Sequence, residues 1–320
     1  MKKGIIVSTT LLLLLVFIIA ETASYFIVKK RVGEYVKISN AIAKKNNSQL
    51  ISLNYNYMEP FNQNRYKGLE RPIYYGDKNK KSVLFFGCSY IYGVNEKEEN
   101  SIPCVINKIT GRTTVNKGFP GGSIINTLIY LTDDSFYDIY KNKTVPEPEY
   151  VIYTYIHDHL ERIVSPYKVF FSSKDLKYEI MPKIEYKNGE FKTVKRSSLL
   201  YPIYCLYITK AITLYWINNL DLITKREDKM FDLLCIAKKI TEQKFPNSKF
   251  VVLVYRNKMD YKMSKSLTKR LRDNGFTVLD AEELAGHELG SEKWRCIDKD
   301  HPNAASFKDV SNGLIKTLGL

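Results

Sequence analysis

Short apolar segments alternate with amphipathic segments along most of this chain, and this alternation constrains the fold more than any other feature. The apolar segments have the length and composition of buried strands, and they cover residues 83–86, 113–115, 150–156, 249–255 and 276–279. The intervening segments have helical patterns and end signals, and they cover residues 101–109, 124–131, 228–245, 264–274 and 304–318. Strands that alternate with helices pair in parallel, and helices cover both faces of their sheet. We therefore expect an α/β fold with a mostly parallel sheet.

The composition argues against a disordered chain and against a nucleic-acid partner. Of the 320 residues, 44% are hydrophobic and 13% are aromatic, which is enough for a sizeable core in one large domain. The net charge of +15 would suit a polyanion, but the lysines are spread along the chain without a dense basic run. The sequence has no helix-turn-helix, zinc-finger or aromatic RNA-binding signature. We expect no nucleic acid among its partners, while protein partners stay open.

The cysteines indicate neither a zinc site nor a complete disulfide framework, because their number is odd and no CxxC pair occurs. The five are Cys88, Cys104, Cys205, Cys235 and Cys296. We expect most of them to be buried apolar side chains. One or two disulfides stay open if the domain lies outside the cytoplasm, but the sequence does not pair them.

An apolar run near the N-terminus predicts a membrane-spanning helix. It covers residues 4–28, about 25 residues, which can cross roughly 30 Å of hydrocarbon with some tilt. A cleaved signal peptide is the competing interpretation, since small residues at Ala20 and Ala23 stand at a plausible cleavage spacing. We favour an uncleaved anchor because the apolar chain continues past that point. The predicted organisation is an anchor at 1–30, a juxtamembrane stem at 31–79 and a folded domain at 80–320.

The segment 165–222 interrupts the alternation and is interpreted as an insertion into the domain. The dipeptide Asn188-Gly189 predicts a hairpin turn, with flanking strands at 178–181 and 191–194. Residues 199–222 are apolar but interrupted by polar residues and a proline, so we expect an amphipathic helix or helix pair. This helical segment would cap the site or lie on the membrane. The expected role of the whole insertion is substrate choice.

A candidate nucleophile follows the strand at 83–86. The strand runs into Gly87, Cys88 and Ser89, which places the hydroxyl of Ser89 at the carboxyl edge of the expected sheet. Open α/β sheets bind their ligands at this edge. On these residues alone, an ordinary turn serine is an equally good interpretation.

Three later segments carry polar groups that would suit acyl-transfer chemistry. A Gly-rich turn at 118–123 precedes a helix and exposes backbone N–H groups to an anion or a developing oxyanion. His157 and His159 follow the strand at 150–156, but no third ligand with metal spacing is evident nearby, so we expect no metal. Asp298 and His301 are three apart in a loop, a spacing that lets the carboxylate orient the imidazole toward a serine.

Taken in this order, the segments around Ser89, the Gly-rich turn, His157-Asp158 and Asp298 to His301 resemble the SGNH, or GDSL-like, hydrolase superfamily over roughly residues 80–320. The resemblance implies a flavodoxin-like three-layer sandwich and a catalytic triad of Ser89, Asp298 and His301. It implies oxyanion donors at the N–H groups of Ser89 and Gly121, with Gly118 as the alternative to Gly121. His157 stands where the family has an asparagine that supplies a third donor. An imidazole can also donate a hydrogen bond. In other enzymes, the loss of one oxyanion donor costs about 3 kcal/mol of transition-state stabilisation.

The resemblance also suggests a function. Membrane-tethered, extracytoplasmic members of the superfamily resemble esterases and O-acyltransferases that modify envelope polysaccharides. We therefore expect a serine esterase or O-acyltransferase acting on acyl esters of carbohydrate, O-acetyl esters in the first place, without a cofactor. The extracytoplasmic location depends on this resemblance and on the signal-like N-terminus, because the positive charges that flank residues 4–28 are nearly balanced.

Two alternatives stay open. One is a catalytically degenerate polysaccharide-binding or assembly subunit, which the replacement of the usual asparagine by His157 would explain. The other is a lipid esterase or lysophospholipase that faces the cytoplasm.

Overall fold

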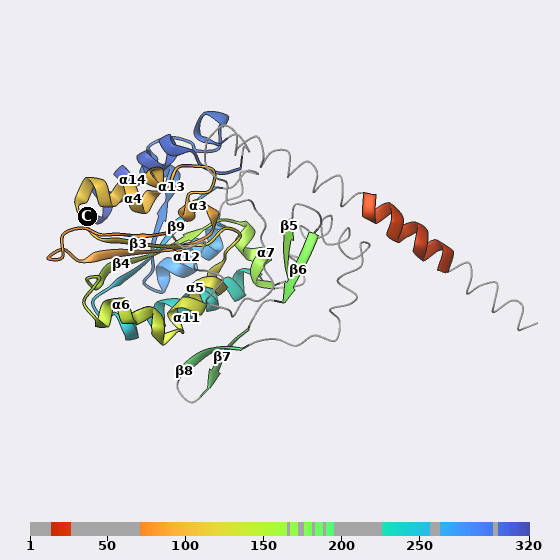
Figure 1. Ribbon diagram of the computed structural model, residues 1–320, viewed down its shortest axis with the longest axis horizontal. Coiled ribbons are helices and arrows are strands. Elements are labelled where there is room, and N and C mark those ends of the chain that lie inside the picture. The colour runs from red at the N-terminus through yellow and green to blue at the C-terminus, as the bar shows by residue number, and fades with distance from the viewer. Residues whose placement is uncertain are drawn as a thin grey trace, which may run out of the picture.

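The computed structural model describes residues 14–26, 71–164, 167–171, 176–180, 183–187, 190–194, 226–256, 263–296 and 300–320. The main body of the chain is built on one six-stranded sheet with the strand order β1-β3-β2-β4-β9-β10 (Figure 1). The strands are β1 (Ile73–Tyr74), β2 (Ser82–Gly87), β3 (Thr114–Gly118), β4 (Pro148–Tyr155), β9 (Lys249–Val254) and β10 (Thr277–Asp280). All neighbours pair in parallel except β1, which is antiparallel to β3 at one edge. The expected mostly parallel α/β sheet is confirmed.

The order of the five parallel strands identifies the topology. Numbered along the chain from β2, these strands lie in the order 2-1-3-4-5, which is the flavodoxin-like arrangement. In this arrangement the direction of strand addition reverses between the first and third strands, here β2 and β4. The carboxyl ends of β2 and β4 therefore flank the position at which such sheets bind ligands.

Helices cover both faces of the sheet. Those of the main body are α3 (Ser89–Tyr92), α4 (Ile102–Thr110), α5 (Ile124–Leu131), α6 (Asp138–Lys141), α7 (Asp158–Val164), α11 (Arg226–Lys244), α12 (Lys265–Asp273), α13 (Ala281–Ala285) and α14 (Ala304–Leu318). Short 3₁₀ turns occur at η1 (Glu98–Asn100), η2 (Asp134–Tyr137) and η4 (Glu292–Trp294). One apolar cluster joins the sheet to α5, α6, α11 and α12, and a second joins it to α4, α13 and α14 (Figure 1).

Strand β2 shows why these strands are apolar at every position instead of alternating between apolar and polar residues. Its side chains point to opposite faces in turn, so Leu84 and Phe86 join the first cluster while Val83 and Phe85 join the second. All four side chains are completely buried. A parallel sheet that is covered on both faces requires apolar residues at every position, which is the pattern that the sequence carries.

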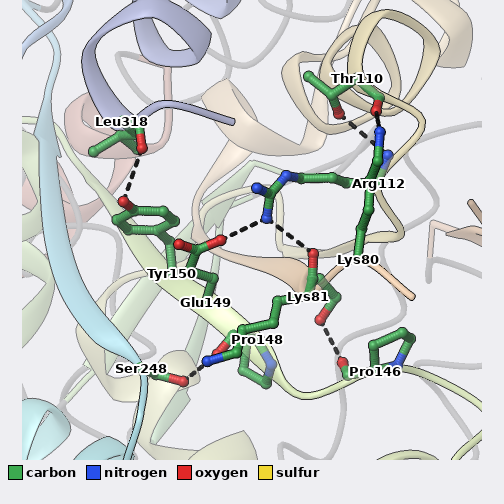
Figure 2. A network of polar contacts seen from close by, with 11 residues as sticks. Lys80, Lys81, Thr110, Arg112, Pro146, Pro148, Glu149, Tyr150, Ser248 and Leu318 are labelled. Atoms are coloured by element: carbon green, nitrogen blue, oxygen red, sulfur yellow. Dashed lines mark hydrogen bonds and ion pairs between the residues drawn. The ribbon is translucent and has the colours of Figure 1, made fainter. Parts of the chain in front are cut away.

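A polar network holds the amino ends of the strands together (Figure 2). The Arg112 guanidinium lies 2.6 Å from the Glu149 carboxylate and donates a second hydrogen bond to the carbonyl of Lys81 at 3.2 Å. The hydroxyl of Tyr150 donates to the carbonyl of Leu318 at the end of α14. These contacts lie at the amino ends of the strands. The candidate site lies at the opposite side of the sheet, at the carboxyl end of β2.

Two hairpins lie in the predicted insertion. Strand β5 (Tyr167–Phe171) pairs with β6 (Leu176–Ile180), and β7 (Lys183–Lys187) pairs with β8 (Glu190–Val194), both antiparallel. The expected hairpin around residues 188–189 is therefore present, but its first strand is β7. The assignment of 178–181 to that strand was wrong, because a two-residue turn requires the strand to end immediately before it, and Lys187 pairs directly with Glu190. The expected helical segment at 199–222 lies outside the described residues.

The N-terminal prediction overlaps the structure only in part. Residues 14–26 form a helix, and several of its apolar side chains, including Leu14, Phe17 and Phe26, are exposed. Within the ranges that the structure describes, none of the helices has the length and apolar character needed to cross a membrane. The remainder of the predicted span lies outside those ranges, as does the predicted stem up to residue 70. Strand β1 falls at the end of the segment assigned to the stem and pairs with the sheet.

Candidate active site

Ser89 lies at the carboxyl end of β2, where the strand turns into α3. Its side chain is largely buried, with 7% of the residue exposed. The turn depends on Gly87, whose φ of +147° is unfavourable for other residues. A Cβ at this position would also lie 3.0 Å from the Cβ atom and the carbonyl of Thr154 on β4. Gly87 therefore lets the two strands that flank the topological switch point approach each other beneath Ser89.

His301 is brought to Ser89 from the other end of the chain. Its Nε2 atom lies 2.8 Å from the Ser89 hydroxyl, a hydrogen-bond distance, although the two residues are separated by 212 positions. His301 stands in the loop before α14, which begins with Asn303 as its N-terminal cap. Two of the three predicted triad residues thus contact each other directly. The third, Asp298, lies outside the described residues, so its role stays a prediction.

Backbone pairing fixes the loop that carries His301. Cys296 donates its N–H to the carbonyl of His301 at 2.7 Å, and Arg295 and Pro302 form an antiparallel bridge. The Asp300 carbonyl, immediately before His301, accepts hydrogen bonds from the Tyr90 hydroxyl and the Arg295 guanidinium, both at 2.7 Å. The loop is therefore attached to α3, the helix that Ser89 begins.

Tyr90 and Asn95 surround the imidazole, and the sequence did not point to either. The Tyr90 ring packs at 5.6 Å from the His301 ring, and burial raises the pKa of the Tyr90 phenol well above its usual value. The phenol thus remains a hydrogen-bond donor at neutral pH. The Asn95 amide nitrogen lies 3.5 Å from Nδ1 of His301, on the side of the ring away from Ser89.

The Gly-rich turn contacts the end of β2. Phe119 donates its N–H to the Gly87 carbonyl at 3.1 Å, and a Cβ at Gly122 would lie 2.7 Å from that same oxygen. Gly121 has a φ of +68°, the left-handed conformation that favours glycine. The guanidinium of Arg162 donates to the Gly122 carbonyl at 2.7 Å, which ties the turn to α7. Arg162 is another residue that the sequence did not single out.

The structure distinguishes the two glycines considered as oxyanion donors. The N–H of Gly118 donates to the Asn116 side chain at 2.9 Å, so this group is already occupied. The buried Asn116 amide also donates to the Ile91 carbonyl at 3.0 Å, which joins β3 to α3. A Cβ at Gly118 would lie only 2.2 Å from Ile91. Gly118 therefore serves the close approach of two elements, and Gly121 is left as the predicted donor.

The two histidines after β4 have different environments. His157 is half-buried and follows the strand that neighbours β2, at the same edge of the sheet as Ser89. His159 is completely buried, and its Nδ1 lies 2.6 Å from the Tyr153 hydroxyl. In the part of the chain that the structure describes, no three histidine, cysteine or acidic side chains gather as metal ligands.

Cys88 is the potential rival nucleophile next to Ser89. It is completely buried, and burial raises the pKa of its thiol above the usual value. A protonated thiol is a poor nucleophile, so Cys88 is explained as a small core residue of the turn. Cys88, Cys104 and Cys235 are free thiols, and Cys205 lies outside the described ranges.

Fold and site together define a doubly wound α/β domain that carries a serine–histidine pair at its topological switch point. No protein-family model matches the sequence, and the search of curated proteins returned no match. The solved structures similar to this chain include a member of the lipolytic protein G-D-S-L family from Veillonella parvula DSM 2008. Its identity is 9%, with 75% of this chain and 99% of that chain covered and a TM-score of 0.43.

An acetyl xylan esterase from the rumen bacterium Butyrivibrio proteoclasticus is also similar, with 9% identity, 75% and 65% coverage and a TM-score of 0.40. A variant of an acetyl-xylooligosaccharide esterase from Geobacillus has 12% identity, 75% and 94% coverage and a TM-score of 0.40. Because a fold alone does not determine function, the function has to be argued from the residues of this chain.

Proposed function

We propose that this chain is a serine esterase or O-acyltransferase whose nucleophile is Ser89 and whose substrates are acyl esters of carbohydrate, O-acetyl esters in the first place. The observation that carries the proposal is the 2.8 Å contact between Ser89 Oγ and His301 Nε2. A serine hydroxyl reacts when a base within hydrogen-bond reach takes its proton. The pair also lies at the edge of the sheet where open α/β folds bind substrates.

The reaction would proceed in two steps. His301 Nε2 takes the Ser89 proton while Oγ attacks the ester carbonyl, and the imidazolium then protonates the departing alkoxide. The resulting acyl group on Ser89 passes to water in a hydrolase or to a second hydroxyl in a transferase. Asp298 would orient the ring and stabilise its positive charge.

The oxyanion formed in each step would be held by backbone N–H groups of Ser89 and Gly121. This assignment is supported by the contact of the Gly-rich turn with the end of β2. His157 would contribute a third donor from the end of β4. Its replacement by a side chain without a donor is expected to slow the reaction, because one such donor is worth about 3 kcal/mol.

We further propose that residues 4–28 anchor the chain in a membrane and that the domain is extracytoplasmic. The apolar run in the sequence supports this location, and the described part of that run is a helix with exposed apolar side chains. Digestion of the domain by protease added to intact cells tests the orientation. Protection from the protease would favour the cytoplasmic lipid esterase instead.

Covalent labelling with a fluorophosphonate probe tests the central claim. Wild-type protein is expected to become labelled, whereas Ser89→Ala should not react. Ser135→Ala is the matched control, because Ser135 is an exposed serine of η2 outside the site. Equal labelling of the wild type and Ser89→Ala would refute the assignment of the nucleophile.

A non-catalytic polysaccharide-binding subunit is the second candidate, and the presence of His157 in place of the usual asparagine favours it. Hydrolysis of p-nitrophenyl acetate by the wild type, lost in His301→Ala, would exclude this candidate. Release of acetate from O-acetylated polysaccharide, compared with hydrolysis of a lysophospholipid, then separates the carbohydrate and lipid substrates.

A further inference from the structure

The imidazole of His301 has a neighbour at each ring nitrogen. Ser89 lies 2.8 Å from Nε2, and the carboxamide nitrogen of Asn95 lies 3.5 Å from Nδ1. Asn95 follows α3 by three residues, so both neighbours belong to the segment that leaves β2. The chemistry expected of His301 depends on which of its two nitrogens carries the proton.

The position of Asn95 is fixed by the structure on both sides. Asn95 has a φ of +68°, a left-handed conformation that asparagine tolerates better than most residues. The next residue, Glu96, accepts a hydrogen bond from the N–H of Ala304 at 3.0 Å. On the other side, Arg71 donates to the carbonyls of Tyr92 and Gly93 at 3.0 and 3.2 Å. The segment that contains Asn95 is therefore held by Arg71 on one side and by the start of α14 on the other.

A carboxamide can present either a donor or an acceptor to the ring. Rotation of the amide by half a turn exchanges its nitrogen and oxygen, and the surrounding hydrogen bonds decide between the two. For Nε2 to accept the Ser89 proton, Nδ1 must carry the ring proton. The group that faces Nδ1 must then be an acceptor, which for Asn95 is its carboxamide oxygen, in the amide orientation opposite to the one that places the nitrogen 3.5 Å from Nδ1.

We propose that Asn95 is a positioning residue for His301, whose carboxamide oxygen accepts the Nδ1 proton and thereby keeps Nε2 free for Ser89. This inference depends on the proposed function, in which His301 is the base. Asn95 would act together with the carboxylate predicted at Asp298, since one N–H can be shared by two acceptors.

Several titratable or charged side chains belong to the elements packed around the ring. They are Tyr90 of α3, Glu96 beside Asn95, and Arg295, Cys296 and Asp300 of the His301 loop, with Asp298 in the same loop outside the described ranges. The variants below leave all of these groups unchanged. A change in the pH profile can therefore be attributed to residue 95.

Two substitutions distinguish the effect of the Asn95 carboxamide from the effect of its backbone conformation. Asn95→Gly keeps the left-handed conformation and removes the side chain, whereas Asn95→Asp keeps the shape and adds a negative charge. Lys143→Gly is the matched control, because Lys143 is an exposed residue with a φ of +53°. Each variant is assayed for p-nitrophenyl acetate hydrolysis from pH 5 to 9, for fluorophosphonate labelling and for thermal unfolding.

We expect Asn95→Gly to lower kcat about 10-fold with little change in KM, because the fraction of His301 in the reactive tautomer falls. Asn95→Asp should move the acidic limb of the kcat/KM profile about one pH unit upward, because a carboxylate stabilises the protonated ring. A merely structural role would lower the thermal stability of Asn95→Gly and leave both pH profiles as in the wild type. That result would overturn the inference.

A second measurement does not depend on activity. The ¹⁵N chemical shifts of the His301 ring report its tautomer, and the signal is assigned by its loss in His301→Gln. The wild type should be mostly protonated at Nδ1, and Asn95→Gly should gain the Nε2-protonated form. An unchanged tautomer ratio would refute the role of Asn95, whereas failure of Ser89 to label would refute the proposed function separately.

Discussion

Replacement of Gly118 by alanine should damage both stability and catalysis, because this glycine determines how closely α3 can approach β3. A Cβ here would lie 2.2 Å from the Ile91 side chain and 2.7 Å from the backbone nitrogen of Tyr92. Ordinary contacts begin near 3.4 Å, so the backbone of α3 would have to move by about 3.4 − 2.7, or roughly 0.7 Å. A side-chain rotation alone cannot remove the contact with Tyr92, because a backbone atom is involved.

The substitution Gly118→Ala is expected to lower both the free energy of unfolding and the reaction rate. Overpacking of this kind lowers the free energy of unfolding by about 1–3 kcal/mol. The same movement carries Ser89, whose hydroxyl is held 2.8 Å from His301, and displacements approaching 1 Å at a reacting group cost on the order of 10²-fold in rate. We therefore expect kcat to fall between about 10-fold and 100-fold.

Urea unfolding and p-nitrophenyl acetate kinetics measure the two effects separately. Gly275→Ala is the control, since its Cβ meets no atom within 4 Å and its φ of +73° costs only about 1 kcal/mol of backbone strain. This control should keep the wild-type kcat. If Gly118→Ala retained wild-type stability and kcat, the argument that Gly118 sets the position of Ser89 would be refuted.

Two further predictions concern the surroundings of the site. Arg162→Gln should lower kcat several-fold and the free energy of unfolding by about 1 kcal/mol, because the Gly122 carbonyl loses its guanidinium donor and the turn that contains Gly121 is no longer held. Enzyme kinetics and urea unfolding measure the two effects, and an unchanged kcat would contradict the prediction. Burial raises the pKa of Tyr153 and Tyr255 in the folded state. Their contribution to the free energy of unfolding should therefore be fully present below pH about 10, where the phenols of the unfolded chain begin to ionise, and should decrease at higher pH. The urea midpoint measured from pH 8 to 11.5 checks this sign, and a constant midpoint would count against it.

The parallel strands and the longer helices α4, α5, α11, α12 and α14 could be predicted closely because each carries its own signals, whereas the short helices α3, α6, α7 and α13 were not predicted. Helix α14 occupies 304–318 as expected, since Asn303 caps its start and Gly319 ends it in a left-handed conformation. Strand β1 was missed because a two-residue antiparallel edge strand is too short to show a period. The first strand of the second hairpin was misplaced because its alternating pattern resembles that of the preceding strand β6.

The residues of the candidate site also fall into those that the sequence could predict and those that it could not. Ser89 and His301 stand in local patterns, a strand end and a loop before a helix, so the sequence could point to both. Asn95 and Arg162 carry no local signal, because their positions follow from contacts with His301 and Gly122, which lie 206 and 40 residues away. Contacts of this kind depend on how the sheet and its helices assemble, and the periodicity of one segment does not encode them.

The hydrogen bonds of Arg71 give the entry of the chain into the domain an unexpected importance. Its guanidinium stacks on the Tyr92 ring at 4.2 Å while it binds the carbonyls that end α3, the helix that Ser89 begins. Arg71 therefore connects the segment that enters the domain to the helix that begins with Ser89, so a displacement of that segment is expected to be transmitted to the position of Ser89.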